Sequence, residues 1–186
     1  MSALVLLAPG FEEIEAITVI DILRRAEIET IVAGLTTNPI PAARATRHLA
    51  DIHLADIDPA REFEIVILPG GIEGAKHLGQ SPHVKQWLNR QRERGQWVAA
   101  ICAAPTALQA HDWLRPDQKI TSHPTVQNQF PAAQMQGDLR VVIDDKGKLI
   151  TSLAAGSAME FAYAIVRTLR GPDTVIKVNA GVCAIL

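Results

Sequence analysis

Cys102 is the side chain of this sequence best suited to chemistry, because it stands where a predicted strand meets a predicted helix. Residues 97–101 are a short apolar run with the length of a buried strand, and residues 103–110 are rich in helix formers, with Pro105 in the first turn. The flanking alanines permit a sharp turn, which lifts a reactive side chain above a sheet as in the nucleophile elbow of hydrolases. Unpaired N–H groups and a positive helix end favour a thiolate there, so we expect a nucleophile. The alternative is a buried cysteine that only packs.

Glu15 is the second candidate. It lies in a predicted amphipathic helix over residues 12–26, with mainly apolar neighbours one or two turns away on the same face: Phe11, Thr18, Val19 and Ile22. A carboxyl in such surroundings loses hydration, which raises its pKa unless a partner compensates. The alternative is an acidic residue favoured by the helix dipole, with its side chain reaching water. The functional interpretation is a partly buried carboxyl that exchanges a hydrogen bond with the sulfur of Cys102.

Backbone amides near the thiol form the third group. Gly70 and Gly71 follow a predicted buried strand over residues 64–68, where glycine allows close backbone approach to a ligand. Their N–H groups, with that of Ala103, could form an oxyanion hole beside the sulfur. An ordinary tight turn between a strand and a helix explains the same Pro-Gly-Gly sequence.

Two further residues could reach the same crevice. His123, in Thr-Ser-His-Pro-Thr, follows a predicted weak strand over residues 119–122, and a Cys–His pair would combine a nucleophile with a general base. Arg47 could supply a cation near the crevice or at an interface, although a solvated arginine is the commoner outcome. Cys183 has no charged neighbours and is predicted to pack. The remaining histidines lack metal-ligand spacing, so we predict no metal site.

The elements that must position these residues alternate between strand and helix. Further strands are predicted over residues 4–8, 29–33, 139–143 and 149–152, and further helices over residues 82–94 and 157–169. The last two strands flank a hairpin signal at residues 144–147, residues 36–62 are irregular, and the apolar tail 174–186 is expected to dock on the body. The pattern predicts an α/β protein with a mostly parallel sheet and helices on both faces. In such sheets the ends of strands 4–8, 64–68 and 97–101 meet at one edge, where functional groups collect.

Composition limits the class of protein. The 186 residues suit one domain spanning 1–186, 48% are apolar, and the net charge is −2. The scattered Lys and Arg residues offer no footprint for nucleic acid. Two cysteines cannot make a disulfide framework, which indicates a reducing compartment. The first apolar run ends at Pro9, too short for a signal peptide or a membrane span, so a cytoplasmic location is predicted.

Five segments, in order along the chain, resemble the ThiJ/PfpI superfamily, and within it the branch of the Parkinson-disease-associated protein deglycase and bacterial YajL. They are Leu-Val-Leu-Leu-Ala-Pro-Gly-Phe-Glu-Glu-Ile-Glu-Ala, Ile-Leu-Pro-Gly-Gly-Ile-Glu-Gly-Ala, Ala-Ala-Ile-Cys-Ala-Ala-Pro-Thr-Ala-Leu, Thr-Ser-His-Pro and Met-Glu-Phe-Ala. The resemblance implies a flavodoxin-like three-layer sandwich and a homodimer. It also implies the following site residues: the oxidation-sensitive nucleophile Cys102, its glutamate partner Glu15, amides at Gly71 and Ala103, a nearby His123, and Arg47 near the site and dimer interface.

The activity implied by the resemblance is glutathione-independent glyoxalase or deglycase action on reactive dicarbonyls or early glycation adducts, with no cofactor. The alternative is a redox sensor or chaperone in which Cys102 is oxidised without turnover.

The sequence departs from the family pattern at two places. Ala103 stands where the protease-like branch has histidine, which argues against a peptidase. Residues 153–157 replace an Arg-Gly-Pro-Gly-type segment, so the pocket rim opposite Cys102 should differ in shape and charge. A flavin, phosphoacceptor or amidotransferase module lacks its required residues.

Overall fold

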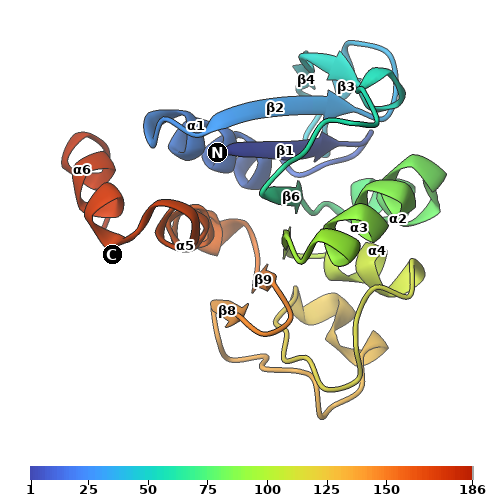
Figure 1. Cartoon of the computed structure of the whole chain (residues 1–186). Helices are drawn as coiled ribbons and strands as arrows, with labels where there is room; N and C mark the ends of the chain where they lie inside the picture. The colour runs from blue at the N-terminus through green and yellow to red at the C-terminus, as the bar shows by residue number, and fades with distance from the viewer. Residues whose placement is uncertain (186) are drawn as a thin grey trace.

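A seven-stranded sheet forms the centre of the computed structural model, which describes residues 1–185 (Figure 1). The strand order is β5-β2-β1-β6-β7-β9-β8, and only β8 runs antiparallel to its neighbour. The strands of this sheet are β1 (Ser2–Leu7), β2 (Glu29–Gly34), β5 (Ile52–His53), β6 (Ile65–Leu68), β7 (Trp97–Ile101), β8 (Val141–Asp144) and β9 (Leu149–Ser152). A separate antiparallel pair consists of β3 (Ile40–Pro41) and β4 (Arg47–His48).

The helices divide between the two faces of the sheet. One core cluster joins the sheet to α1 (Glu13–Arg25), α5 (Ala158–Arg170) and α6 (Pro172–Val182). The other joins it to α2 (Ile72–Gln80), α3 (Pro82–Arg94) and α4 (Pro105–Ala110), with η1 (Leu54–Asp56) and η2 (Pro124–Gln129). Figure 1 shows these two groups on opposite sides of the strands. The predicted flavodoxin-like α/β sandwich is therefore confirmed.

Residue alternation within the central strands explains the two cores. Val5 and Ile67 point into the core beneath α1 and α5, whereas Leu4 and Val66 point into the core beneath α3 and α4. All four are fully buried, as expected for parallel strands covered on both faces. In register, Val5 pairs with Ile67 and Ile67 with Ala99, so the carboxyl ends of β1, β6 and β7 lie at one edge.

Three parts of the fold differ from the sequence prediction. Segment 119–122 is not a strand: Ile120 forms only an isolated bridge with Met135, because the Thr121 amide donates to the Thr151 side chain at 2.9 Å instead of joining a ladder. Helix α2 was not predicted, since Gly74 and Gly79 lower its helix propensity. The irregular region 36–62 contains the short strands β3, β4 and β5.

The hairpin and the tail follow the prediction. Strands β8 and β9 pair antiparallel around the turn, with Ile143 opposite Ile150. The tail forms α6, whose buried Val175 and Val178 join the core beneath α5; residue 186 lies outside the described residues. Among residues 1–185, no helix has the length and apolar character needed to cross a bilayer.

Replacing Ile165 by Ala should lower the free energy of unfolding by about 2–5 kcal/mol, because the side chain on α5 is fully buried and its removal leaves a cavity. The matched control is Ile176→Ala on α6, where the isoleucine is 69% exposed and the loss should stay within about 0.5 kcal/mol. Urea denaturation of both variants measures the difference. Equal losses would show that α5 does not anchor the core as described.

Candidate active site

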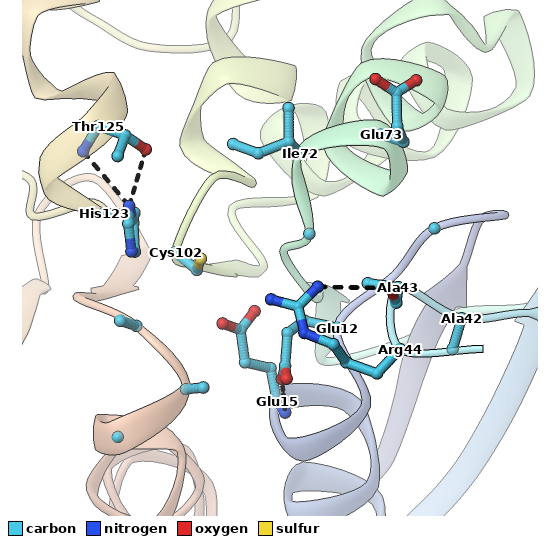
Figure 2. A pocket seen from close by; sticks show the side chains of 15 residues that line it. Glu12, Glu15, Ala42, Ala43, Arg44, Ile72, Glu73, Cys102, His123 and Thr125 are labelled. Carbon is cyan, nitrogen blue, oxygen red and sulfur yellow. Dashed lines mark hydrogen bonds between the residues drawn. The ribbon is translucent and has the colours of Figure 1, made fainter. Parts of the chain in front are cut away.

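A cavity of about 650 Å³ lies at the carboxyl edge of the sheet (Figure 2). Its lining comes from the segments that follow β1, β6, β7 and β9, together with the turn between β3 and β4. These elements meet there because their parallel strands end at the same edge. Cys102 and Glu15 both line this cavity, and Figure 2 shows the Glu15 carboxyl pointing toward the Cys102 sulfur.

Cys102 occupies the sharp turn predicted between β7 and α4. Its φ is +63°, a left-handed conformation that is unfavourable for a residue with a side chain and is held by the surroundings. The Cys102 amide donates to the Ser152 carbonyl at 2.9 Å, and its own carbonyl accepts from the His123 amide at 2.9 Å. The elbow is therefore fixed from β9 on one side and from the segment before η2 on the other.

Glycine at position 70 is required by close packing against both reactive side chains. A Cβ atom there would lie 2.5 Å from Glu15 Oε2 and 2.7 Å from Cys102 Cβ. The Gly70 amide donates to Glu15 Oε2 at 2.8 Å. Gly71 has φ +85° and would place a Cβ atom against the Gly10 carbonyl. The Pro-Gly-Gly turn thus admits the carboxyl and the thiol to one space.

Glu15 is fully buried. Burial raises the pKa of its carboxyl to about 7, and the charge of Glu12 adds to this, whereas hydrogen bonds with Cys102 and the Gly70 amide oppose it. No donor among residues 1–185 is placed with the distance and angle of a hydrogen bond to Glu15 Oε1. The carboxyl is thus poised to exchange a proton near neutral pH. The sequence-based expectation of a desolvated carboxyl beside the sulfur agrees with this geometry.

The expectation of an ionised, low-pKa thiol is wrong for the resting site. Cys102 is only 9% exposed, and burial together with the negative charge and hydrogen bond of Glu15 raises its pKa to about 12. Hydrogen bonds from the amides of Gly71 and Ala103 to the sulfur oppose the rise without cancelling it. A thiolate is therefore favoured only when the proton moves to Glu15, which removes the competing negative charge.

His123 also lines the cavity, on the side next to Cys102 (Figure 2). Its Nδ1 lies 2.8 Å from Thr125 Oγ1, which leaves Nε2 as the ring nitrogen able to serve a ligand. Its catalytic role stays a prediction. Within residues 1–185 no group of three or more His, Cys, Asp or Glu side chains is arranged to hold a metal ion.

The arginine of the cavity is Arg44, not Arg47. Arg47 lies exposed in β4 and is not among the residues that line the cavity, so its predicted role near the crevice or at an interface stays a prediction. Arg44 enters the cavity because its amide is bound by Glu13 Oε1 at 2.7 Å, which shapes the turn between β3 and β4. In the sequence, Arg44 follows Pro41 in a short run of small residues, and this run is what could have indicated a turn that carries the Arg44 side chain to the cavity.

Ala154, Ala155 and Gly156, which follow β9, also line the cavity, and the predicted difference of this rim in shape and charge stays a prediction. Cys183, predicted to pack, is exposed instead, because α6 ends there and the residue adopts φ +58° beyond the last turn. The two thiols thus differ in setting: one lies in a recess beside a carboxyl, and the other faces solvent.

The fold and the site define a flavodoxin-like α/β protein with a cysteine elbow beside a buried glutamate. The sequence model described as "DJ-1/PfpI family" matches residues 1–168, so the chain belongs to the DJ-1/PfpI family, and the resemblance read from the five segments is confirmed.

Relatives cover nearly the whole chain. Parkinson disease protein 7 homolog of Danio rerio is 37% identical over 179 residues, 96% of this chain and 94% of that protein. Glutathione-independent glyoxalase DJR-1.2 of Caenorhabditis elegans is 38% identical, covering 92% of this chain and 90% of its own length. The crystal structure of Drosophila melanogaster DJ-1beta has a TM-score of 0.94 at 40% identity and covers 100% of this chain and 98% of its own.

Glu15→Gln should stabilise the protein more at pH 8 than at pH 4. A carboxyl whose pKa rises from 4.5 to about 7 on folding contributes stability below pH 4.5, and this is lost as the pH rises through 7. The difference in unfolding free energy between variant and wild type should therefore grow by about 3 kcal/mol from pH 4 to pH 8. Urea denaturation at both pH values measures it, with the exposed Glu93→Gln on α3 as control. An equal pH dependence in both variants would contradict the burial of an ionisable Glu15.

Proposed function

We propose that this protein converts reactive 2-oxoaldehydes to 2-hydroxy acids without glutathione, and acts by the same chemistry on early glycation adducts. The observation that carries the proposal is the buried pair of Glu15 and Cys102 in an open cavity, with a carboxyl pKa of about 7. The printed name of the Caenorhabditis elegans relative, glutathione-independent glyoxalase, supports the reaction class. The protein is of the DJ-1 type, for which a stress-response role is the corresponding proposal.

The first step forms a carbon–sulfur bond. The ionised Glu15 carboxylate takes the thiol proton as the Cys102 sulfur attacks the aldehyde carbon. The carbonyl oxygen becomes an alkoxide, stabilised by the amides of Gly71 and Ala103, which already hydrogen-bond to the sulfur. Glu15 then returns the proton to this oxygen, which completes a hemithioacetal and leaves the carboxylate ionised again.

The second stage moves a hydrogen between adjacent carbons. Glu15 removes the proton from the former aldehyde carbon while the ketone oxygen takes up a proton, which gives an enediol. Glu15 then delivers its proton to the neighbouring carbon as the hydroxyl on the former aldehyde carbon becomes the thioester carbonyl, and the proton that this hydroxyl releases replaces the one taken up by the ketone oxygen. The product is a 2-hydroxy thioester on Cys102, which water cleaves to the hydroxy acid and the free thiol. One water is consumed, the aldehyde carbon is oxidised and the ketone carbon is reduced, so no external oxidant or cofactor is needed. Arg44 and His123 line the same cavity and can donate to the ketone oxygen.

Glycation adducts extend the same chemistry. An early adduct of a dicarbonyl with an amine or thiol keeps a carbon at the aldehyde oxidation level, which the sulfur can attack once the adduct reopens. A homodimer and a cytoplasmic location remain part of the proposal. The exposed Ile14 and Ile17 on α1 support the homodimer, since neighbouring apolar side chains on a surface are typical of an interface.

Cys102→Ser and Glu15→Gln should each lower kcat/KM for methylglyoxal at least 100-fold, because one removes the nucleophile and the other the proton acceptor. Lactate formation measures the turnover. Glu15→Gln should leave Cys102 open to alkylation by iodoacetamide at pH 8, at no less than the wild-type rate, because removing the carboxylate charge lowers the pKa of the thiol. Cys183→Ser, at the exposed thiol, is the control and should leave turnover unchanged. Lactate formation that survives Cys102→Ser would refute the proposal.

The second candidate is a redox sensor in which Cys102 is oxidised without turnover. Two observations favour it: the amides of Gly71 and Ala103 are directed at the sulfur, where they could bind sulfinate oxygens, and a solved relative is "Toxoplasma gondii DJ-1, oxidized", with a TM-score of 0.93 at 31% identity, covering 100% of this chain and 99% of its own. The glyoxalase and sensor functions use the same sulfur, so they are compatible.

Mild peroxide should add two oxygens to Cys102 before Cys183 in the wild-type protein, because Glu15 takes the thiol proton as the Cys102 sulfur attacks peroxide, whereas Cys183 has no neighbouring carboxyl to do so. The proton on Glu15 can then donate to the sulfinate and stop further oxidation. Peptide mass spectrometry measures both sites. The Glu15→Gln variant should accumulate more of the three-oxygen product at Cys102. Preferential oxidation of the exposed Cys183 would contradict the sensor proposal.

A further inference from the structure

The cavity is much larger than methylglyoxal requires. Its volume of about 650 Å³ lies in the range of sites that enclose drug-sized ligands, whereas a three-carbon dicarbonyl fills only a small part of it. The space that Cys102 and Glu15 do not use is lined in part by two groups of small residues, beside the charged side chains of Glu12, Arg44 and Glu73. We call them the rim wall, Ala154, Ala155 and Gly156, and the turn wall, Ala42 and Ala43.

The rim wall is held rigidly. Ser157 Oγ accepts from the Ala154 amide at 3.1 Å, donates to the Ala154 carbonyl at 2.8 Å and lies 2.8 Å from Ser152 Oγ. The Arg140 guanidinium donates to Glu160 Oε1 at 2.7 Å and also to the Gly156 carbonyl. These bonds fix the backbone, so the wall cannot collapse inward to fill the space that its small side chains leave.

The turn wall is fixed in the same way. The Ala42 amide donates to the Thr46 carbonyl at 2.9 Å, and the Ala43 amide donates to the Phe11 carbonyl at 2.8 Å. The charged side chains of the lining, Glu12, Arg44 and Glu73, are at least partly exposed to solvent. An apolar group between the two walls can therefore leave water while these charges stay hydrated.

The positions of Glu15 and Cys102 determine the orientation of a ligand in the cavity. Glu15 lines the cavity, is fully buried, and has an Oε1 with no ideal hydrogen-bond partner among residues 1–185. A polar reacting group belongs beside this oxygen and the Cys102 sulfur. The rest of the ligand then extends between the walls.

We propose that the rim wall and the turn wall bind the apolar substituent of a 2-oxoaldehyde longer than methylglyoxal, and that Ala155 and Ala43 determine this preference. The inference rests on the proposed function and specifies its substrate class. Each methylene buried between the walls should raise kcat/KM about fourfold, the value expected for transfer of a CH₂ group out of water.

The test is a homologous series running from methylglyoxal through 2-oxobutanal and 2-oxopentanal to 2-oxohexanal. For the wild-type protein, kcat/KM should rise at each step. Ala155→Leu fills the space and should lower kcat/KM for 2-oxohexanal at least tenfold, while methylglyoxal changes less than threefold. Ala43→Leu, on the opposite wall, is a second variant with the same expected pattern. Ala60→Leu, at an exposed position, is the matched control.

Binding is measured separately, as protection of Cys102 from iodoacetamide by the product series from lactate to 2-hydroxyhexanoate. Thermal unfolding verifies that each variant is folded. Protection that strengthens with chain length in wild type and not in the leucine variants supports the inference even where turnover is absent. A flat wild-type series, or a slope that both leucine variants leave unchanged, would overturn it while leaving the proposed function intact. Absence of turnover for every aldehyde would overturn the proposed function alone.

Discussion

The central constraint of this structure is a carboxyl group buried without a compensating cation. Glu15 gains only the Gly70 amide at Oε2 and the neighbouring thiol, so its proton is held more tightly than in water. A carboxyl at the end of an amphipathic helix would ordinarily turn outward. Here α1 packs along the sheet with Glu15 on its buried face, and the close approach at Gly70 encloses the side chain. The unfavourable burial is tolerated because the apolar side chains of α1 pack into the core that it shares with the sheet and α5.

That burial changes how the cysteine should be understood. In an ordinary reactive site the surroundings lower the thiol pKa, and the thiolate waits for its substrate. At this elbow the ionised carboxyl and the enclosure raise the thiol pKa to about 12, so the sulfur and the carboxyl act on a single proton. In the proposed mechanism the reactive thiolate arises by movement of this proton from Cys102 to Glu15. Amides at Gly71 and Ala103 make that movement less unfavourable without making the thiolate the resting state.

The sequence predicted those features that depend on local pattern. Apolar runs predict β1, β6 and β7, and the shared edge at which these strands end predicts that Cys102, Glu15 and Gly70 lie together, as they do. The features that the sequence did not predict depend on interactions between residues that are far apart along the chain. The pKa of Cys102 depends on enclosure by several loops, and the entry of Arg44 depends on a hydrogen bond from α1. Neither leaves a periodic signal in the chain.

The hydrogen bond from the Cys102 amide to the Ser152 carbonyl links the cysteine elbow to a strand that is synthesised 50 residues later. A nascent chain that ends before β9 contains the cysteine, but not the neighbour that fixes its left-handed backbone. On the ribosome this residue is therefore an ordinary flexible cysteine. The left-handed backbone of Cys102 is therefore held in place only after the C-terminal hairpin has emerged and docked.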